Sequence, residues 1–207
     1  LSDGSFVYIS PDYNFQPAAT LFAKAGAVHW VAQNRNPVGI ANIGANAGPA
    51  IYGAASNDRI GSGGVTALSN GAFVVNSPEH NGQRGAVTWL TGGMLNGSTV
   101  SISNSLVGIS ANDRVGSGGI IKLFDGNYVV NSYEWRGGAG AVTWVNGSNG
   151  NIFGLNLNNG TVSNTSSLVG FSGQNSVSGA NAETGQGGVL ALANGRYVVV
   201  SPKFDDI

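Results

Sequence analysis

The sequence lacks cysteine and has few charged residues. None of its 207 residues is cysteine, and Asp, Glu, Lys and Arg together make up 9% of the chain. The absence of thiols excludes a disulfide scaffold, cysteine-ligated zinc, iron–sulfur sites and thiol catalysis. With nine Lys and Arg and a formal net charge of −1, the chain has no basic surface of the kind that nucleic-acid binding requires.

Long apolar runs are also missing. No stretch approaches the roughly 18 apolar residues of a membrane-spanning helix. The chain starts at Leu1 without the basic and apolar regions of a signal peptide, so we expect a mature or excised piece of a longer protein. Its 42% hydrophobic content is too high for simple disorder.

Internal repetition is the strongest feature of what is present. Four blocks recur in the same order along the chain. They are Asn-Asp-Arg-Ile/Val-Gly-Ser-Gly-Gly (57–64, 112–119, and weakened at 181–188), a block centred on Asn-Gly or Asp-Gly (1–8, 68–75, 123–130, 192–199), Ala-Val-x-Trp (27–30, 86–89, 141–144) and Ser-Leu-Val-Gly (105–108, 167–170). The unit is about 55 to 69 residues long, which predicts one array made of a partial unit (1–52), two full units (53–107 and 108–176, the second with insertions) and another partial unit (177–207).

Each unit predicts strands joined by turns. An Asn-Gly or Asp-Gly pair between apolar runs is a strong hairpin signal, and it predicts a type I′ turn with positive φ at both central residues. Strands are expected at 65–68, 73–76 and 86–90, and the alternating 100–103 segment predicts a fourth. The Gly-rich 61–64 segment is expected in a crowded inner strand. We expect almost no helix.

Four short antiparallel strands in a unit of this length are typical of a β-propeller blade. The predicted fold class is therefore an all-β repeat protein with propeller-like blades. A β-solenoid and a β-sandwich are the alternatives, although solenoid repeats are usually about 20 to 30 residues long.

The order of these motifs resembles the FG-GAP repeat of integrin-α-type propellers. It is closer still to repeats in large bacterial exoproteins of the filamentous-haemagglutinin type, which use two-partner secretion. This resemblance implies a propeller-like fold, a secreted or cell-surface setting and a role in adhesion. The calcium loop of FG-GAP repeats is reduced here to short turns such as 69–72 and 124–127, with at most one carboxylate each. Calcium prefers six to eight oxygen ligands, so we expect neither calcium nor another cofactor.

An acidic residue and an aromatic or imidazole ring follow the second strand in three repeats. The pairs are Asp12-Tyr13, Glu79-His80 and Glu134-Trp135, and Lys203-Phe204 takes their place in the last unit. A carboxylate beside a ring is a common construction of a sugar-binding site, so these six residues are the candidate ligand-binding residues. The alternative is that the rings merely cover the edge of a blade.

Two other sets of repeated residues are interpreted as structural. Asp and Arg in the Asn-Asp-Arg segments would connect neighbouring blades, and Asn or Asp would cap a turn. A repeated ligand or ion site at the two Asp residues is the alternative. The Trp that ends each Ala-Val-x-Trp strand is expected in the core between blades. These residues are Asn57, Asp58, Arg59, Asn112, Asp113, Arg114, Trp30, Trp89 and Trp144.

Catalytic and metal-site motifs are missing from the sequence. It contains no Gly-x-Ser-x-Gly elbow, no His-Glu-x-x-His motif and no phosphate-binding loop. We therefore expect a non-enzymatic module of a secreted or cell-surface protein that binds glycans, or a host or neighbouring cell surface, through loops on one face. The alternative is a structural spacer or fibre that associates with itself through open end strands. Two chains could also close one ring.

Overall fold

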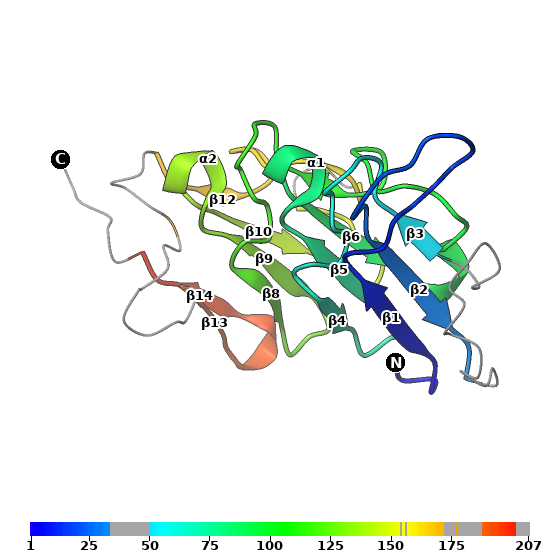
Figure 1. The fold of residues 1–207 in the computed structure, drawn as a ribbon. Helices are drawn as coiled ribbons and strands as arrows, with labels where there is room; N and C mark the ends of the chain where they lie inside the picture. Colours follow the sequence, from blue (N-terminus) through cyan, green and yellow to red (C-terminus); the bar gives the residue numbers. More distant parts are fainter. Residues whose placement is uncertain (34–49, 154, 156, 172–176, 178–187, 202–207) are drawn as a thin grey trace.

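The computed structural model describes residues 1–33, 50–153, 155, 157–171, 177 and 188–201. Within these residues the fold is mostly β, with four sheets that follow one another across the molecule in chain order (Figure 1). This confirms the expected β-rich repeat architecture. The weakened Asn-Asp-Arg copy, apart from Gly188, and the Lys203-Phe204 pair lie outside the described residues.

Antiparallel hairpins are the basis of each sheet. The first sheet has the order β1 (Phe6–Ser10), β2 (Ala27–Val31) and β3 (Ala50–Tyr52). The second has the order β11 (Gly160–Thr161), β7 (Leu106–Val107), β6 (Ala86–Leu90), β5 (Phe73–Ser77) and β4 (Val65–Ala67). The third has the order β12 (Leu168–Val169), β10 (Ala141–Val145), β9 (Tyr128–Ser132) and β8 (Gly119–Lys122). The fourth pairs β13 (Val189–Ala191) with β14 (Tyr197–Val199).

Hairpins are present at Asn70-Gly71, Asp125-Gly126 and Asn194-Gly195. The predicted positive φ at both central residues is found at Asn194-Gly195, with values of 63° and 74°, but not at the other two turns. β4 and β5 are joined by a five-residue loop in which the N–H of Leu68 donates to the carbonyl of Ala72 over 2.9 Å. Gly71 has a φ of +84°, whereas Asn70 is not left-handed. Asn70 instead accepts the N–H of Ala72 at its side-chain oxygen, 3.1 Å away. The longer loop reverses the chain with one left-handed residue, so a two-residue type I′ turn is not needed.

Two further strand predictions are wrong. Residues 101–104 form a turn rather than a strand, because the side-chain oxygen of Asn104 accepts the N–H of Ser101. The fourth strand of the second sheet is β7, a few residues later. The 61–64 segment is also a turn, in which the N–H of Gly64 donates to the carbonyl of Gly61 over 2.9 Å. It leads into β4 instead of forming an inner strand.

Helical structure in the described residues is limited to single turns. These are α1 (His80–Gln83), α2 (Trp135–Gly138), η2 (Gly92–Met94) and η3 (Ala193–Gly195). Left-handed residues interrupt α1 and α2, so these turns reverse the chain between two strands. No helix in this part of the chain has the length and apolar character needed to cross a membrane.

The core is divided into three apolar layers, each between two neighbouring sheets. Phe73 and Val75 belong to the layer shared with the first sheet, whereas Val74 belongs to the layer shared with the third. Because side chains alternate along a strand, β5 contributes to a layer on both of its faces. In β9, Val129 belongs to the third layer, together with Val189 of the last sheet. Each internal sheet is therefore covered on both faces by its neighbours.

Candidate functional site

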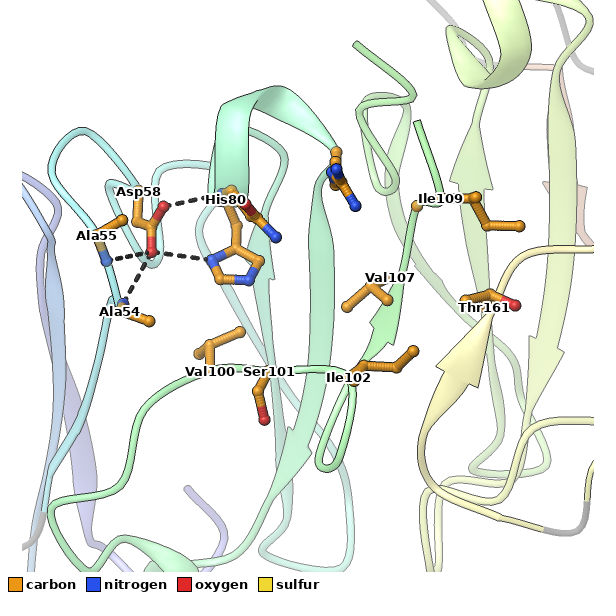
Figure 2. Close-up of a pocket in the computed structure, with 13 residues that line it drawn as sticks. Ala54, Ala55, Asp58, His80, Val100, Ser101, Ile102, Val107, Ile109 and Thr161 are labelled. Carbon is orange, nitrogen blue, oxygen red and sulfur yellow. Dashed lines mark hydrogen bonds and ion pairs between the residues drawn. The ribbon is translucent and has the colours of Figure 1, made fainter. Parts of the chain in front are cut away.

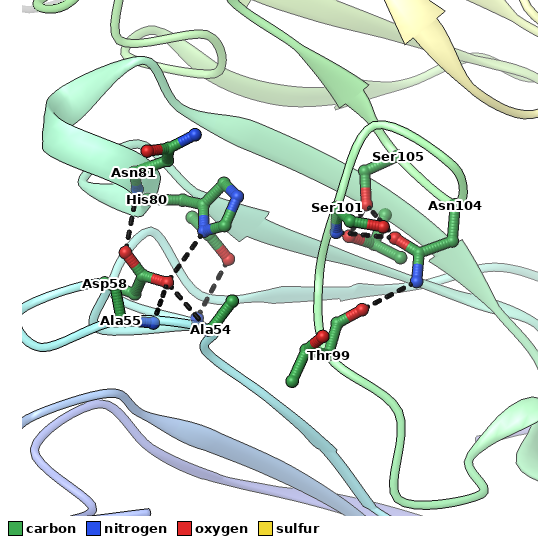
Figure 3. Close-up of polar contacts among 12 residues, drawn as sticks. Ala54, Ala55, Asp58, His80, Asn81, Thr99, Ser101, Asn104 and Ser105 are labelled. Carbon is green, nitrogen blue, oxygen red and sulfur yellow. Dashed lines mark hydrogen bonds and ion pairs between the residues drawn. The ribbon is translucent and has the colours of Figure 1, made fainter. Parts of the chain in front are cut away.

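The Asn-Asp-Arg segment of the first full repeat places a carboxylate among the loops at one end of the sheets. One oxygen of Asp58 accepts the backbone N–H groups of Ala54 and Ala55, 2.8 and 2.9 Å away. The other oxygen accepts the N–H of Asn81, in α1, over 2.9 Å (Figure 3). Asp58 is 1% exposed. The carboxylate thus connects the turn before it to the loop that follows β5.

Asp113 makes the corresponding contacts one repeat later. It accepts the N–H groups of Ile109 and Ser110 with one oxygen and that of Arg136 with the other. Asp113 is also buried. With three backbone donors each, the two carboxylates occupy hydrogen-bonded positions within the fold. The preceding residues, Asn57 and Asn112, are exposed and left-handed, with φ values of 65° and 66°.

The arginines of the same segments pair with the acidic residues that were predicted to bind ligand. Arg59 lies 3.2 Å from a carboxylate oxygen of Asp12 and 3.1 Å from one of Glu79. Arg114 lies 3.0 Å from a carboxylate oxygen of Glu134. Arg59 therefore links the loop after β1 to the loop after β5.

The rings of the three predicted pairs are not equally accessible. His80 and Trp135 are buried, with exposed fractions of 5% and 6%. Tyr13 is half-buried and lies edge-on against His29, with ring centres 6.3 Å apart. Asp12 is the most exposed carboxylate of the three, at 65% of its side chain. The structure therefore places each pair in a different environment, although the pairs share one repeat position.

His80 faces Asp58 across the end of the second sheet. Its Nδ1 lies 3.2 Å from Oδ2 of Asp58 (Figures 2 and 3). Burial raises the pKa of the Asp58 carboxyl, but the His80 contact and the N–H groups of Asn81 and Ala54 outweigh this effect. The resulting pKa lies below the ordinary value of 3.8. The sequence suggested neither this pairing nor the burial of His80, because the two residues are 22 positions apart.

The repeated tryptophans lie half-buried at the edges of the apolar layers. Trp30, Trp89 and Trp144 each pack against a different layer. The indole N–H of Trp89 donates to the carbonyl of Gly147, in the next repeat, over 3.0 Å. The indole N–H of Trp30 donates to Ser5 Oγ, just before β1 of the same sheet, also over 3.0 Å.

A glycine directly before the Ala-Val-x-Trp strands β2 and β6 allows two repeats to approach closely. A Cβ on Gly85 would lie 2.2 Å from the backbone nitrogen of Val115, and Gly85 has a φ of +79°. Val115 donates its N–H to the carbonyl of Arg84 over 3.0 Å. Gly26 has the same relation to Ile60. The Gly-Ala-Val pattern is the sequence signal for this contact, but the partner segment comes from the next repeat.

A cavity of about 520 Å³ lies beside His80. Its walls include Val100, Val107 and Ile109 (Figure 2). In the described part of the chain, no three His, Asp or Glu side chains come together as a metal site would require.

Comparison with protein families matches two segments of the chain, 67–117 and 122–179, to a repeat of unknown function, DUF5650. No curated protein matches the chain. The matched segments together cover more than half of the sequence and include most of the second and third sheets. The chain therefore belongs to the DUF5650 family of repeats.

Proposed function

We propose that this chain is a non-catalytic structural module whose sheets stack repeat upon repeat, within a large secreted or cell-surface protein. The observation that carries the proposal is that equivalent residues are buried inside the array and exposed at its two ends. The ends thus present the same surfaces that bind neighbouring repeats in the interior. We propose that their partner is another repeat of the same kind, supplied by a second copy of the chain.

The face of the last sheet supports this proposal. Val74 and Val129 occupy one repeat position and are fully buried, each facing the next sheet. Val198 occupies that position in β14 and is 43% exposed. Leu190 and Val200 add to the same face, with exposed fractions of 58% and 51%. Among the described residues, no sheet covers this apolar face.

The face of the first sheet has the complementary residues. Phe73 and Tyr128 face the preceding sheet and are 0% and 2% exposed. Phe6 occupies their position in β1 and is 37% exposed, as is Tyr8 on the same face. A head-to-tail contact between two chains would cover both faces with the interior type of packing. Such heterologous contacts generate rings or filaments, depending on the rotation between units.

The blade-like sheets, together with the motif order that resembles FG-GAP repeats, support a propeller-like arrangement of the assembled units. The same resemblance supports a bacterial exoprotein of the filamentous-haemagglutinin type and an extracellular location. The low charge content is compatible with that setting.

Light scattering over a range of protein concentrations, followed by electron microscopy, tests the stacking proposal. We expect rings or filaments from the wild type and loss of assembly in Val198→Arg. Phe124→Arg is the matched control, because Phe124 is 78% exposed but lies in a hairpin loop outside the end faces. A wild type that remains monomeric at all concentrations, or equal effects of the two variants, would contradict the proposal.

A second candidate function, glycan binding in adhesion, is favoured by an aromatic cluster near Asp12. Phe15 and Tyr52 stack with ring centres 4.1 Å apart, and Tyr13 lies 5.9 Å from Tyr52. The exposed carboxylate of Asp12 could accept sugar hydroxyls beside these rings. A glycan array tests this function: binding should be lost in Asp12→Ala and retained in Glu134→Ala, because the ring beside Glu134, that of Trp135, is buried. An array without bound glycans would exclude it.

A further inference from the structure

The cavity beside His80 is bounded by apolar side chains and has the size of a small-molecule site. Val100, Ile102, Val107 and Ile109 line it together with Ala54 and Ala55. Its volume of about 520 Å³ falls within the range of roughly 300–1,000 Å³ that is usual for ligand pockets.

The wall that carries Val100 and Ser101 is held by a local hydrogen-bond network. Asn104 accepts the N–H of Ser101 and donates to the carbonyl of Thr99, each over 2.9 Å (Figure 3). The hydroxyl of Ser105 also donates to Asn104 and lies 2.7 Å from that of Thr88, in β6. These contacts anchor the turn to the second sheet, so this wall is formed before any ligand arrives.

His80 provides a polar group at the inner end of the cavity. Asp58 lies on the Nδ1 side of the ring, which favours the tautomer with its proton on Nδ1. Nε2 then carries a lone pair on the side of the ring away from Asp58 (Figure 2). Among the described residues, none forms a hydrogen bond with Nε2. The cavity therefore combines apolar side chains with a hydrogen-bond acceptor at His80. Its lining also includes the polar residues Asp58, Asn81, Arg84, Ser101 and Thr161.

The next repeat indicates which group fits this position. Trp135 is the equivalent of His80 and is only 6% exposed. It belongs to the same apolar cluster as Val162, the repeat equivalent of Val100, and Val169, the equivalent of Val107, packs against that cluster. An aromatic ring thus occupies the corresponding place between repeats. The smaller imidazole of His80 leaves that space open.

We propose that the cavity beside His80 binds a small aromatic molecule whose N–H or O–H group donates a hydrogen bond to Nε2 of His80. The site would be specific to the first full repeat, because the second fills it with its own Trp135 side chain. This binding activity is independent of the stacking proposed above, since the cavity lies beside β7 and not on either end face.

Titration of the wild-type protein with indole, followed by NMR of the histidine ring protons, tests the proposal directly. The chain has only two histidines, His29 and His80. Indole should shift the His80 signals in a saturable manner and leave those of His29 unchanged. No shift at His80, or equal shifts at both rings, would overturn the proposal. This measurement needs no variant and no assembly.

A matched pair of probes tests the hydrogen bond. 1-Methylindole has nearly the same shape as indole but no N–H donor. It should bind about threefold to tenfold more weakly, as expected for the loss of one hydrogen bond. Equal affinity would show that His80 does not accept a hydrogen bond from the ligand.

Reciprocal exchange of the two equivalent residues tests the origin of the site. His80→Trp should fill the cavity and weaken indole binding about tenfold or more. Trp135→His should open a second site and raise the number of bound indoles from one to two. Unchanged indole affinity in a folded His80→Trp variant would refute the assignment. If that variant does not fold, the titration of the wild type still decides the proposal.

Discussion

Asp58 and Asp113 lie one repeat apart and accept backbone N–H groups from the same three places in their repeats. Each carboxylate accepts two N–H groups from the turn before it. It accepts a third from the second residue of α1 or α2, the short helix after the hairpin. They differ in their neighbours, because Asp58 faces His80 whereas the residue equivalent to His80 is Trp135. The same carboxylate framework thus supports an imidazole in one repeat and an indole in the next.

Asp58 should make the stability of the protein depend on pH in the acidic range. Its pKa is lowered below 3.8 in the folded state, so its contribution is present above that value and is lost as the pH falls through the lower, folded-state pKa. Asp58→Asn should reduce the free energy of unfolding at pH 7 by about 1–3 kcal/mol. Urea denaturation between pH 2 and pH 7 measures both effects. A wild-type minus variant difference that stays constant over this range would contradict the prediction.

Gly85→Ala should destabilise the contact between the second and third sheets. The added methyl group would lie 2.2 Å from the backbone nitrogen of Val115, at a residue with a φ of +79°. The expected loss exceeds about 1 kcal/mol, because strain and steric overlap act together. Gly93→Ala is the control, since its methyl group would meet no atom within 4 Å and its φ is not left-handed. In thermal unfolding, the midpoint temperature of Gly85→Ala should therefore be clearly lower than that of Gly93→Ala.

The sequence predicted those features that depend on local pattern. The Ala86–Leu90 strand and the hairpin before it were predictable because alternation and turn residues act over a few positions. The 100–103 segment was mispredicted because its hydrogen bonds are not those of a strand in its own sheet. Val100 donates its N–H to Tyr52 of the preceding sheet, and the following residues fold into the Asn104 turn.

The candidate site was predictable only in part. The repeat identified Asp58 and Glu79 as members of recurring motifs, but not that Arg59 pairs with Glu79 or that Asp58 faces His80. Those relations depend on how one loop lies over another. The cavity also could not be predicted, because its lining comes from separate segments of the chain, including 54–58, 80–84, 100–102 and 107–109.

Trp89→Phe should cost about 1 kcal/mol of stability, because it removes the indole donor to the carbonyl of Gly147 and preserves most of the apolar contact. The lost bond joins two repeats, so the variant should also reduce hydrogen-exchange protection near Gly147. Trp144→Phe is a suitable comparison, since within the described residues the indole N–H of Trp144 makes no hydrogen bond. Trp144→Phe should therefore reduce the free energy of unfolding by less than Trp89→Phe does. Equal costs in urea denaturation would mean that the Trp89 hydrogen bond contributes nothing.

Val74→Ala and Val198→Ala should have very different effects, although the two residues share one repeat position. Val74 is fully buried between two sheets, and removing its two methyl groups should cost about 1.5–3 kcal/mol. Val198 is 43% exposed, so in the monomer its truncation should change the free energy of unfolding by less than about 0.5 kcal/mol. Denaturation at low protein concentration makes this comparison. At a concentration where chains stack, the cost of Val198→Ala should rise toward that of Val74→Ala, because stacking would bury the end face as the interior faces are buried. A cost that does not change with protein concentration would argue that this face has no partner.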